Sequence, residues 1–211
     1  MAALPTERLR IGVLGSGSGT NCEAILQACE RGDLPARVVI VISDVADAPI
    51  LDRARRRGIR AEFIGPSRFK TKLEPELEER VVRWLQEAGV GLVALAGYLR
   101  VVKAPLLRAF AGRMLNIHPS LLPAFPGLHS WEQAWNYGVK VTGCTVHFVN
   151  EGVDAGPIVL QEAVPVREDD TPATLHQRIH EVEHRLFPAA IKLFAEGRLQ
   201  LEGRHVRIAK S

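Results

Sequence analysis

The sequence predicts an α/β fold of the Rossmann-like kind, in which a mostly parallel central sheet carries helices on both faces. Strand-length apolar stretches alternate with helix-length amphipathic stretches along most of the 211 residues. Residues 37–43 (RVVIVIS) are almost all β-branched, which is typical of a strand buried on both faces. The first apolar stretch runs straight into a glycine-rich turn and then a helix. Together these observations favour strands joined by crossover helices.

Glycine and proline residues mark the ends of several predicted elements. Gly32, Gly58 and Gly89 each follow a helical stretch, where glycine closes helices. Thr171 and Pro172 have the side chains of an N-cap and a first helical turn. The predicted strands are 9–14, 37–43, 59–64, 90–96, 115–118, 141–149 and 157–166, followed by a terminal hairpin over 198–209. The predicted helices are 22–30, 48–57, 74–88, 103–110, 131–137 and 172–195.

Composition and charge favour an ordinary globular protein that binds a small anion. The chain is 46% hydrophobic and 24% charged, with 27 Lys and Arg against 24 Asp and Glu. A net charge of +3 fits an anionic small molecule and does not argue for nucleic acid. The densest basic run, residues 53–57, is interpreted as the solvated face of a helix. No linker divides the sequence, so we expect one domain over residues 1–211.

Cysteine usage and hydropathy favour a cytoplasmic protein. Cys22, Cys29 and Cys144 form no CxxC pair and no metal-ligand spacing, so we expect reduced thiols and no metal. No apolar run is long enough to suggest a membrane span, and the first nine residues do not resemble a signal peptide. The state of assembly is left open between monomer and homodimer.

The glycine-rich turn after the first strand is a candidate phosphate site. Gly15, Gly17 and Gly19 lie between a strand and a helix, where backbone N–H groups and the helix dipole favour an anion. Thr20 occupies the third glycine position of the dinucleotide fingerprint, so that motif fails. We predict that a phosphate monoester binds Gly17, Ser18, Gly19, Thr20 and Asn21. The alternative is a tight turn in which Thr20 or Asn21 caps the helix.

A second candidate site follows from the strand over residues 115–118. Alternation sends Leu115 and Ile117 into the core and presents Asn116 and His118 together on the other face. Pro119 ends the strand, and the proline-rich segment behind it favours an irregular loop. An amide beside an imidazole can polarise a carbonyl and move a proton. The alternative is a polar pair on a solvated surface, in which the histidine is structural.

Three ordered motifs give these residues a context. They are NIHPSLLPAFPG at 116–127, GCTVHFV at 143–149 and DAGPI at 154–158. Taken in this order, and with the glycine loop, they closely resemble the glycinamide ribonucleotide formyltransferases of purine synthesis, in the stand-alone bacterial form. The resemblance runs along nearly the whole chain and implies the formyltransferase fold. By itself, Asp154 would be interpreted as a turn aspartate.

The resemblance implies that Asn116, His118 and Asp154 form a catalytic triad. The expected reaction transfers a formyl group from 10-formyltetrahydrofolate, as co-substrate, to the amine of glycinamide ribonucleotide in IMP synthesis. Both expected partners are small molecules. By the same resemblance the half over about 9–110 binds phosphate, and the half over about 111–211 binds folate and carries catalysis.

Further residues receive roles from the same resemblance. Lys72 falls where the family usually has a phosphate-binding arginine, and Glu183 matches the carboxylate at the substrate's amino end; the alternative for Glu183 is a surface helix residue. Thr145 and His147 are expected to support the triad. The expected folate-binding residues are Tyr98, Leu99, Arg100, Val101, Val102, Asn116 and Asp154.

The expected mechanism is direct attack of the amine on the formyl carbon. Asn116 and a protonated His118 would stabilise the developing oxyanion. Asp154 is expected to raise the pKa of His118 and keep it cationic, and to relay a proton through water. No covalent intermediate is needed, so we expect Cys144 to be inert.

Four alternatives are weighed against this prediction. Methionyl-tRNA formyltransferase and formyltetrahydrofolate deformylase share the chemistry, but each carries an added domain that we do not expect here. A dinucleotide-dependent oxidoreductase is disfavoured by the broken glycine fingerprint and by Asp44, which lies too far along the sequence for a ribose-binding acid. A phosphate-binding module without catalysis would leave Asn116, His118 and Asp154 unexplained.

Overall fold

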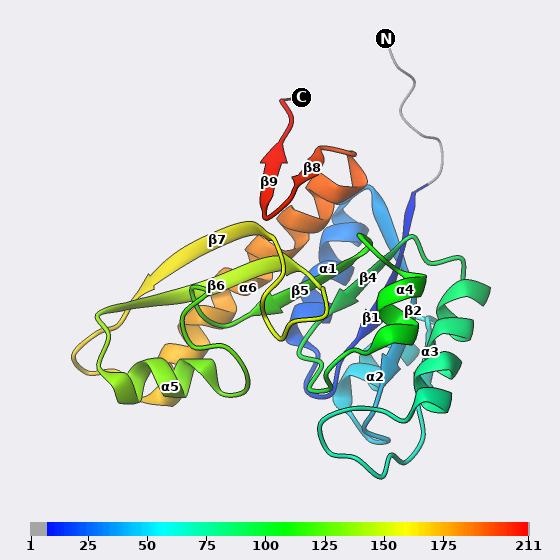
Figure 1. The fold of residues 1–211 in the computed structure, drawn as a ribbon, viewed down its shortest axis with the longest axis horizontal. Helices are drawn as coiled ribbons and strands as arrows, with labels where there is room; N and C mark the ends of the chain where they lie inside the picture. The colour runs from blue at the N-terminus through cyan, green and yellow to red at the C-terminus, as the bar shows by residue number, and fades with distance from the viewer. Residues whose placement is uncertain (1–7, 211) are drawn as a thin grey trace.

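A seven-stranded sheet runs through the whole molecule (Figure 1). The computed structural model describes residues 8–210. The strand order is β3-β2-β1-β4-β5-β6-β7; β1 to β5 run parallel to one another, and β6 runs antiparallel to both of its neighbours, β5 and β7. The predicted mostly parallel α/β sheet is confirmed. The strands are β1 (Leu9–Leu14), β2 (Ala36–Ser43), β3 (Arg60–Phe63), β4 (Leu92–Leu95), β5 (Met114–His118), β6 (Val141–Phe148) and β7 (Ile158–Pro165).

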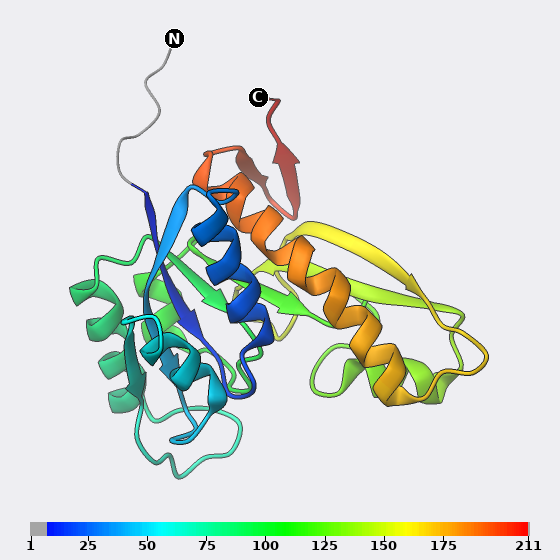
Figure 2. The same ribbon diagram turned by 180° about the vertical axis from the view of Figure 1, so that it is seen from behind.

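Helices cover both faces of this sheet, as predicted. One face is packed by α1 (Thr20–Arg31), α2 (Pro49–Arg55) and α6 (Pro172–Ala195), and Figure 2 shows α1 and α6 side by side there. The other face is packed by α3 (Pro75–Glu87) and α4 (Ala104–Ala109). A short helix, α5 (Ser130–Tyr137), packs against α6. The chain ends in the predicted hairpin, β8 (Leu199–Glu202) and β9 (His205–Ile208).

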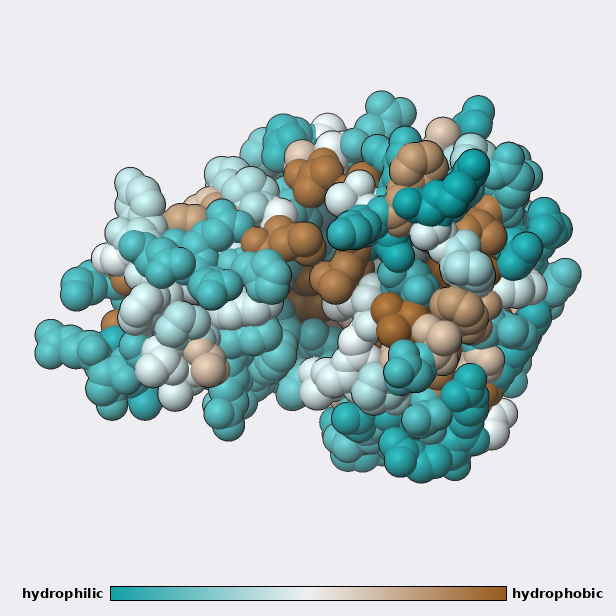
Figure 3. Space-filling model, turned by 90° about the horizontal axis from the view of Figure 1, so that it is seen from below, coloured by the Kyte–Doolittle hydropathy of each residue, from teal (hydrophilic) through white to brown (hydrophobic). Residues whose placement is uncertain are grey.

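The strand order locates the binding edge of the sheet. The chain winds outward from β1 through β2 to β3, then returns to β4 on the other side of β1. The loops that follow β1 and β4 therefore diverge, which opens a crevice at the carboxyl ends of these strands. The glycine loop follows β1, and the predicted folate segment 98–102 follows β4. Seen from below, the surface is hollowed between the side that carries α5 and the side that carries α2 to α4, with apolar side chains around the hollow (Figure 3).

One correction to the predicted elements concerns the start of α1. The helix begins at Thr20, two residues before the predicted start, and its N-cap is Gly19, with φ 72°. No side chain caps this end, so the alternative in which Thr20 or Asn21 caps the helix is wrong. In contrast, Thr171 caps α6 as predicted, through a capping box with Thr174.

Candidate active site

The three glycines of the loop after β1 have different reasons to be there. A Cβ at Gly15 would lie 2.8 Å from the Ala96 carbonyl oxygen, and one at Gly19 would lie 2.6 Å from Ile50. Packing alone therefore requires glycine at these two positions. Gly17 is exposed, and a Cβ there would meet nothing within 4 Å. Its side-chain-free backbone is accessible to a ligand.

The backbone N–H groups of residues 17–21 form a row of free donors at the start of α1. Within residues 8–210, none of these five groups has a hydrogen-bond acceptor. Their neighbours in the loop are paired, since Gly15 N donates to Ile42 O and Ser16 N to Gly97 O. Unpaired N–H groups at a helix N-terminus, together with the helix dipole, make a binding site for an anion.

Asn21 and Glu183 join this loop to α6. Asn21 Nδ2 donates to Glu183 Oε2 at 2.8 Å, and both side chains are buried. Glu183 is 2% exposed, so the alternative of a surface residue is wrong. Burial raises the pKa of Glu183 to about 7, although the hydrogen bond from Asn21 opposes the rise. The Asn21 Nδ2 group is thus committed to Glu183, while Asn21 Oδ1 and the Asn21 backbone N–H have no partner within residues 8–210.

The central strand presents Asn116 and His118 as the alternation predicts. Leu115 and Ile117 lie in the core that faces α6, while Asn116 and His118 lie on the opposite face of β5. His118 is only 4% exposed, and His118 Nε2 donates to Phe125 O at 2.9 Å. The proline-rich segment therefore folds back over the histidine and fixes its ring.

Asp154 reaches the same place from the loop between β6 and β7. Its Oδ2 lies 3.4 Å from His118 Nδ1 and accepts from Gly127 N at 2.8 Å. Asp154 has φ 50°, a left-handed conformation that aspartate tolerates better than most residues. The loop packs tightly on β6, because a Cβ at Gly156 would lie 1.7 Å from Phe148 O. The structure thus brings together the three residues predicted as a triad.

His147 completes the cluster from β6, directly opposite Asn116 in the strand register. His147 Nδ1 donates to Phe148 O at 2.8 Å, so Nε2 is left as the acceptor for Asn116 Nδ2 at 3.1 Å. The same Nε2 lies 3.7 Å from Asp154 Oδ1. One N–H of Asn116 is thereby held by His147, and its second N–H stays available for a ligand.

The protonation of the pair corrects one prediction. Burial lowers the pKa of His118, and this effect outweighs the carboxylate of Asp154, which acts in the opposite direction. The expectation that Asp154 raises the pKa of His118 is confirmed, but the expectation that it keeps His118 cationic is wrong. For Asp154, burial raises the pKa, but His147, His118 and the Gly127 N–H together lower it. Near neutral pH, Asp154 is ionised and His118 is neutral.

Thr145 supports the segment that follows His118. It is fully buried on β6 opposite His118, donates to Ser120 O at 2.7 Å and accepts from Leu122 N at 3.1 Å. Gln161, which the sequence prediction missed, donates to Thr145 Oγ1 at 2.9 Å and to Leu122 O at 2.8 Å. The sequence carries no local signal for Gln161, because its partners are 16 and 39 residues away.

The predicted folate segment presents few free polar side chains. Leu99 is 57% exposed, whereas Val102 is buried and packs with α3 and α4. Val101 N donates to Thr71 O at 2.8 Å. Burial raises the pKa of Tyr98, whose hydroxyl has no partner within residues 8–210. Contacts to a ligand from this segment would therefore come from Leu99 and the backbone.

Arg100 and Asp44 tie that segment to the glycine loop. Asp44 accepts from Ser16 Oγ and from Arg100 Nε, each at 2.6 Å, and its side chain is 4% exposed. Arg100 also donates to Phe69 O, and Ser16 Oγ accepts from Leu99 N at 2.9 Å. Asp44 is thus a structural link between two predicted substrate segments. The sequence carries no local signal for this role, because the partners of Asp44 lie 28 and 56 residues away.

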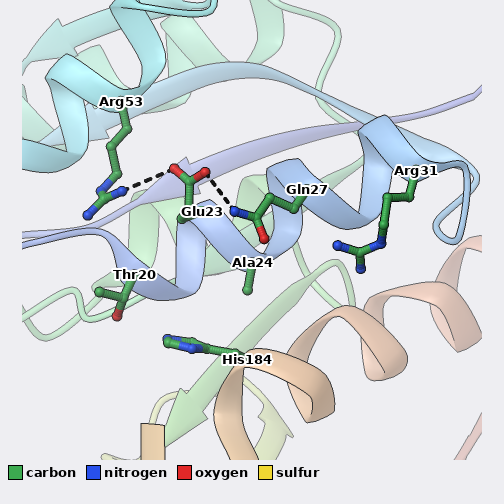
Figure 4. A pocket seen from close by; sticks show the side chains of 7 residues that line it. All are labelled: Thr20, Glu23, Ala24, Gln27, Arg31, Arg53 and His184. Atoms are coloured by element: carbon green, nitrogen blue, oxygen red, sulfur yellow. Dashed lines mark hydrogen bonds and ion pairs between the residues drawn. The ribbon is translucent and has the colours of Figure 1, made fainter. Parts of the chain in front are cut away.

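Lys72 lies on the exposed loop between β3 and α3, with Nζ 4.6 Å from the Phe69 ring centroid. Nearby, Phe69 O accepts a hydrogen bond from Arg100 of the predicted folate segment. A pocket of about 290 Å³ lies farther along α1, between α1, α2 and α6 (Figure 4). It is lined by Thr20, Glu23, Ala24, Gln27, Arg31, Arg53 and His184.

The three cysteines are free thiols, and burial raises the pKa of Cys144 to about 12. Among the residues that the structure describes, no group of three or more His, Cys, Asp or Glu side chains is arranged to hold a metal ion. Over the same range, no helix is long and apolar enough to cross a membrane.

Comparison with known proteins identifies the family. Residues 9–191 match the family model described as formyl transferase. The chain is 42% identical to the phosphoribosylglycinamide formyltransferase of Haemophilus influenzae, over 92% of this chain and 90% of that protein. It is 45% identical to the human trifunctional purine biosynthetic protein adenosine-3 over 92% of this chain, but spans only 19% of that protein's length.

A solved structure agrees with this match. The crystal structure of glycinamide ribonucleotide transformylase 1 from Symbiobacterium toebii superposes with a TM-score of 0.93 at 56% identity. It covers 98% of this chain and 96% of its own. The chain therefore belongs to the formyl transferase family, among the phosphoribosylglycinamide formyltransferases.

Proposed function

We propose that this protein transfers the formyl group of 10-formyltetrahydrofolate to the amine of glycinamide ribonucleotide, a step of de novo IMP synthesis. The observation that carries the proposal is the meeting of Asn116, His118 and Asp154, with Asp154 Oδ2 3.4 Å from His118 Nδ1, on a chain of this family. A single domain acting in the cytoplasm is part of the proposal.

The ribonucleotide phosphate binds the free N–H groups of residues 17–21, with Lys72 adding positive charge. Glu183 receives the amino end of the substrate. Its pKa of about 7 means that it is ionised in part near neutral pH and can accept a hydrogen bond or a proton from an ammonium group. The hydrogen bond between Asn21 and Glu183 fixes the phosphate end relative to the amino end.

The formyl donor lies against the segment 98–102 and reaches Asn116. Formyl transfer forms a bond between the substrate nitrogen and the formyl carbon, breaks the bond from that carbon to N10 of the folate, and moves one proton from the amine to N10. The free N–H of Asn116 donates to the oxyanion as it develops. His147 holds the side chain of Asn116, and Thr145 holds the segment that follows His118.

His118 starts neutral and acquires charge during the reaction. Its Nε2–H is held by Phe125 O, so Nδ1, which faces Asp154, is the atom that takes up a proton. Asp154, through a bound water, carries the amine proton to this position and returns it to N10. The carboxylate stabilises the imidazolium while it exists, because opposite charges favour each other's ionised forms.

The test is a spectrophotometric assay of deformylated folate release by the purified protein, with and without glycinamide ribonucleotide. We expect release only when the ribonucleotide is present. Asp154→Asn should lower turnover by roughly 10²-fold or more, the usual loss when an acid–base group is removed. Release without the ribonucleotide would instead indicate a hydrolase, and no release under either condition would support a binding module.

A further inference from the structure

We propose that Arg53 of α2 is a positioning residue of the phosphate site. Its guanidinium holds the Ser18 carbonyl so that the backbone N–H groups of the glycine loop face the ligand. The inference rests on the proposed function, since it concerns the same ribonucleotide phosphate. It differs from the sequence-based interpretation of residues 53–57 as a solvated helix face.

Two successive carbonyl groups of the glycine loop are bound by α2. Gly17 O accepts from the backbone N–H of Ile50 at 3.2 Å, and Ser18 O accepts from Arg53 Nε at 2.8 Å. The next carbonyl, Gly19 O, accepts from Glu23 N at 2.9 Å within α1. Each carbonyl in this stretch is therefore directed into the protein.

The direction of these carbonyl groups fixes the direction of the free donors. In a planar trans peptide, the C=O and the N–H of the same unit point in opposite directions. Holding Ser18 O against α2 therefore turns Gly19 N–H away from α2, and holding Gly17 O does the same for Ser18 N–H. Both N–H groups belong to the free row of residues 17–21.

Arg53 is itself held in place by a second contact. Its Nη1 donates to Glu23 Oε2 at 3.1 Å, as Figure 4 shows, and Glu23 also accepts from Gln27 and Arg57. The Arg53 side chain is 28% exposed, so water does not fully replace these contacts. Ser18 is exposed and Gly17 lacks a side chain, so their own side chains do little to order the loop. The guanidinium of Arg53 supplies that order from outside the loop.

Arg55 provides a matched control on the same helix. Within residues 8–210 its guanidinium has one partner, Asp52 of the same helix, at 2.9 Å, and the Arg55 side chain is 53% exposed. Removing Arg55 takes away one positive charge of the same kind and leaves both loop carbonyls bound. A comparison of Arg53→Ala with Arg55→Ala therefore separates the contact with Ser18 from the charge of the helix.

The experiment is steady-state kinetics of wild type, Arg53→Ala, Arg53→Lys and Arg55→Ala, with each substrate varied in turn. For Arg53→Ala we expect the KM for glycinamide ribonucleotide to rise about tenfold, the loss typical of one hydrogen bond to a charged group. The inhibition constant of inorganic phosphate should rise by the same factor. The folate KM and kcat should stay within about twofold, and Arg53→Lys should recover part of the loss, because an ammonium can still reach one acceptor.

Several results would overturn the inference. Equal ribonucleotide KM values for Arg53→Ala and Arg55→Ala would remove the role of Arg53. A loss in kcat and in both KM values together, with a lower melting temperature, would indicate a general structural role. A KM ratio that falls toward one at high salt would indicate charge instead of positioning, since screening weakens only the former. Failure of the proposed function looks different, because the wild type would then show no ribonucleotide-dependent turnover.

Discussion

The two ends of the site present different kinds of chemical group. At the glycine loop, the donors are backbone N–H groups of residues 17–21, and their direction is set by contacts from α2. At the end of β5, the groups are the side chains of Asn116, His118 and Asp154, two of which titrate. The first end depends on how the backbone is folded, and the second depends on side-chain identity and protonation.

This difference has consequences for mutation and pH. Backbone N–H groups do not titrate and survive changes of the loop's own side chains, so binding at the loop should be tolerant of substitutions within the loop. The buried side chains of the triad have pKa values set by burial and by each other, so turnover should be sensitive to both. Four predictions, beginning with the largest expected effect, test this comparison.

A single substitution among Asn116, His118 and Asp154 should be enough to abolish most of the turnover. We expect Asn116→Ala to lower kcat by about 10²–10³, as found for other oxyanion donors, with the ribonucleotide KM nearly unchanged. Steady-state kinetics check this, with Asn136→Ala on the exposed face of α5 as control. Near-full turnover in Asn116→Ala would remove Asn116 from catalysis.

Glu183, which binds Asn21 of the glycine loop, should couple stability to pH. The folded protein keeps this carboxyl protonated up to a pKa of about 7, whereas the unfolded chain releases the proton near 4.5. The free energy of unfolding should therefore fall as pH rises between these values, by at most about 3 kcal/mol. Glu183→Gln should lose this fall, so its stability relative to wild type should be greater at pH near 8 than at pH near 5.

Urea unfolding at both pH values measures the effect of Glu183, with the exposed neighbour Glu181→Gln as control. The same variant should raise the ribonucleotide KM and flatten its pH dependence near 7. An identical pH dependence of unfolding in wild type and Glu183→Gln would contradict the assignment of the raised pKa to this residue.

Lys72 tests how much a side chain contributes to the phosphate site. It is the one exposed cation that the proposal adds to the backbone N–H groups of residues 17–21. We expect Lys72→Met to raise the ribonucleotide KM by several-fold, as the loss of one solvent-screened charge allows, without a change in kcat. Lys70→Met, on the same exposed loop, is the control. Equal effects in the two variants would mean that Lys72 has no particular place at the phosphate.

The smallest effect should come from the loop itself. Ser18 is exposed, and the group that it offers to phosphate in this proposal is its backbone N–H. Ser18→Ala should therefore leave the ribonucleotide KM within about twofold of wild type, the size of a minor contact. A tenfold rise would show that the hydroxyl itself binds the ligand, and the contrast between backbone and side-chain ends would fail.

Local sequence was sufficient for most of the fold. The β-branched run of β2, the glycine after α1 and the cap of α6 each predict an element that the structure contains. These signals work because strand burial, positive φ and capping depend on neighbouring residues. The predicted start of α1 is two residues late, because the N-cap residue is Gly19, which has no side chain that could serve as a capping signal in the sequence.

The features of the site likewise fall into those that local sequence predicts and those that depend on tertiary packing. Alternation along β5 by itself determines that Asn116 and His118 share a face, and three glycines between a strand and a helix predict a loop open to an anion. Only the tertiary structure decides that Asp154 meets His118, that His118 is neutral, and that Arg53 holds Ser18 instead of facing solvent. The physical reason is that contact across 36 residues, burial and desolvation depend on which distant segments pack together, and the local sequence does not specify this.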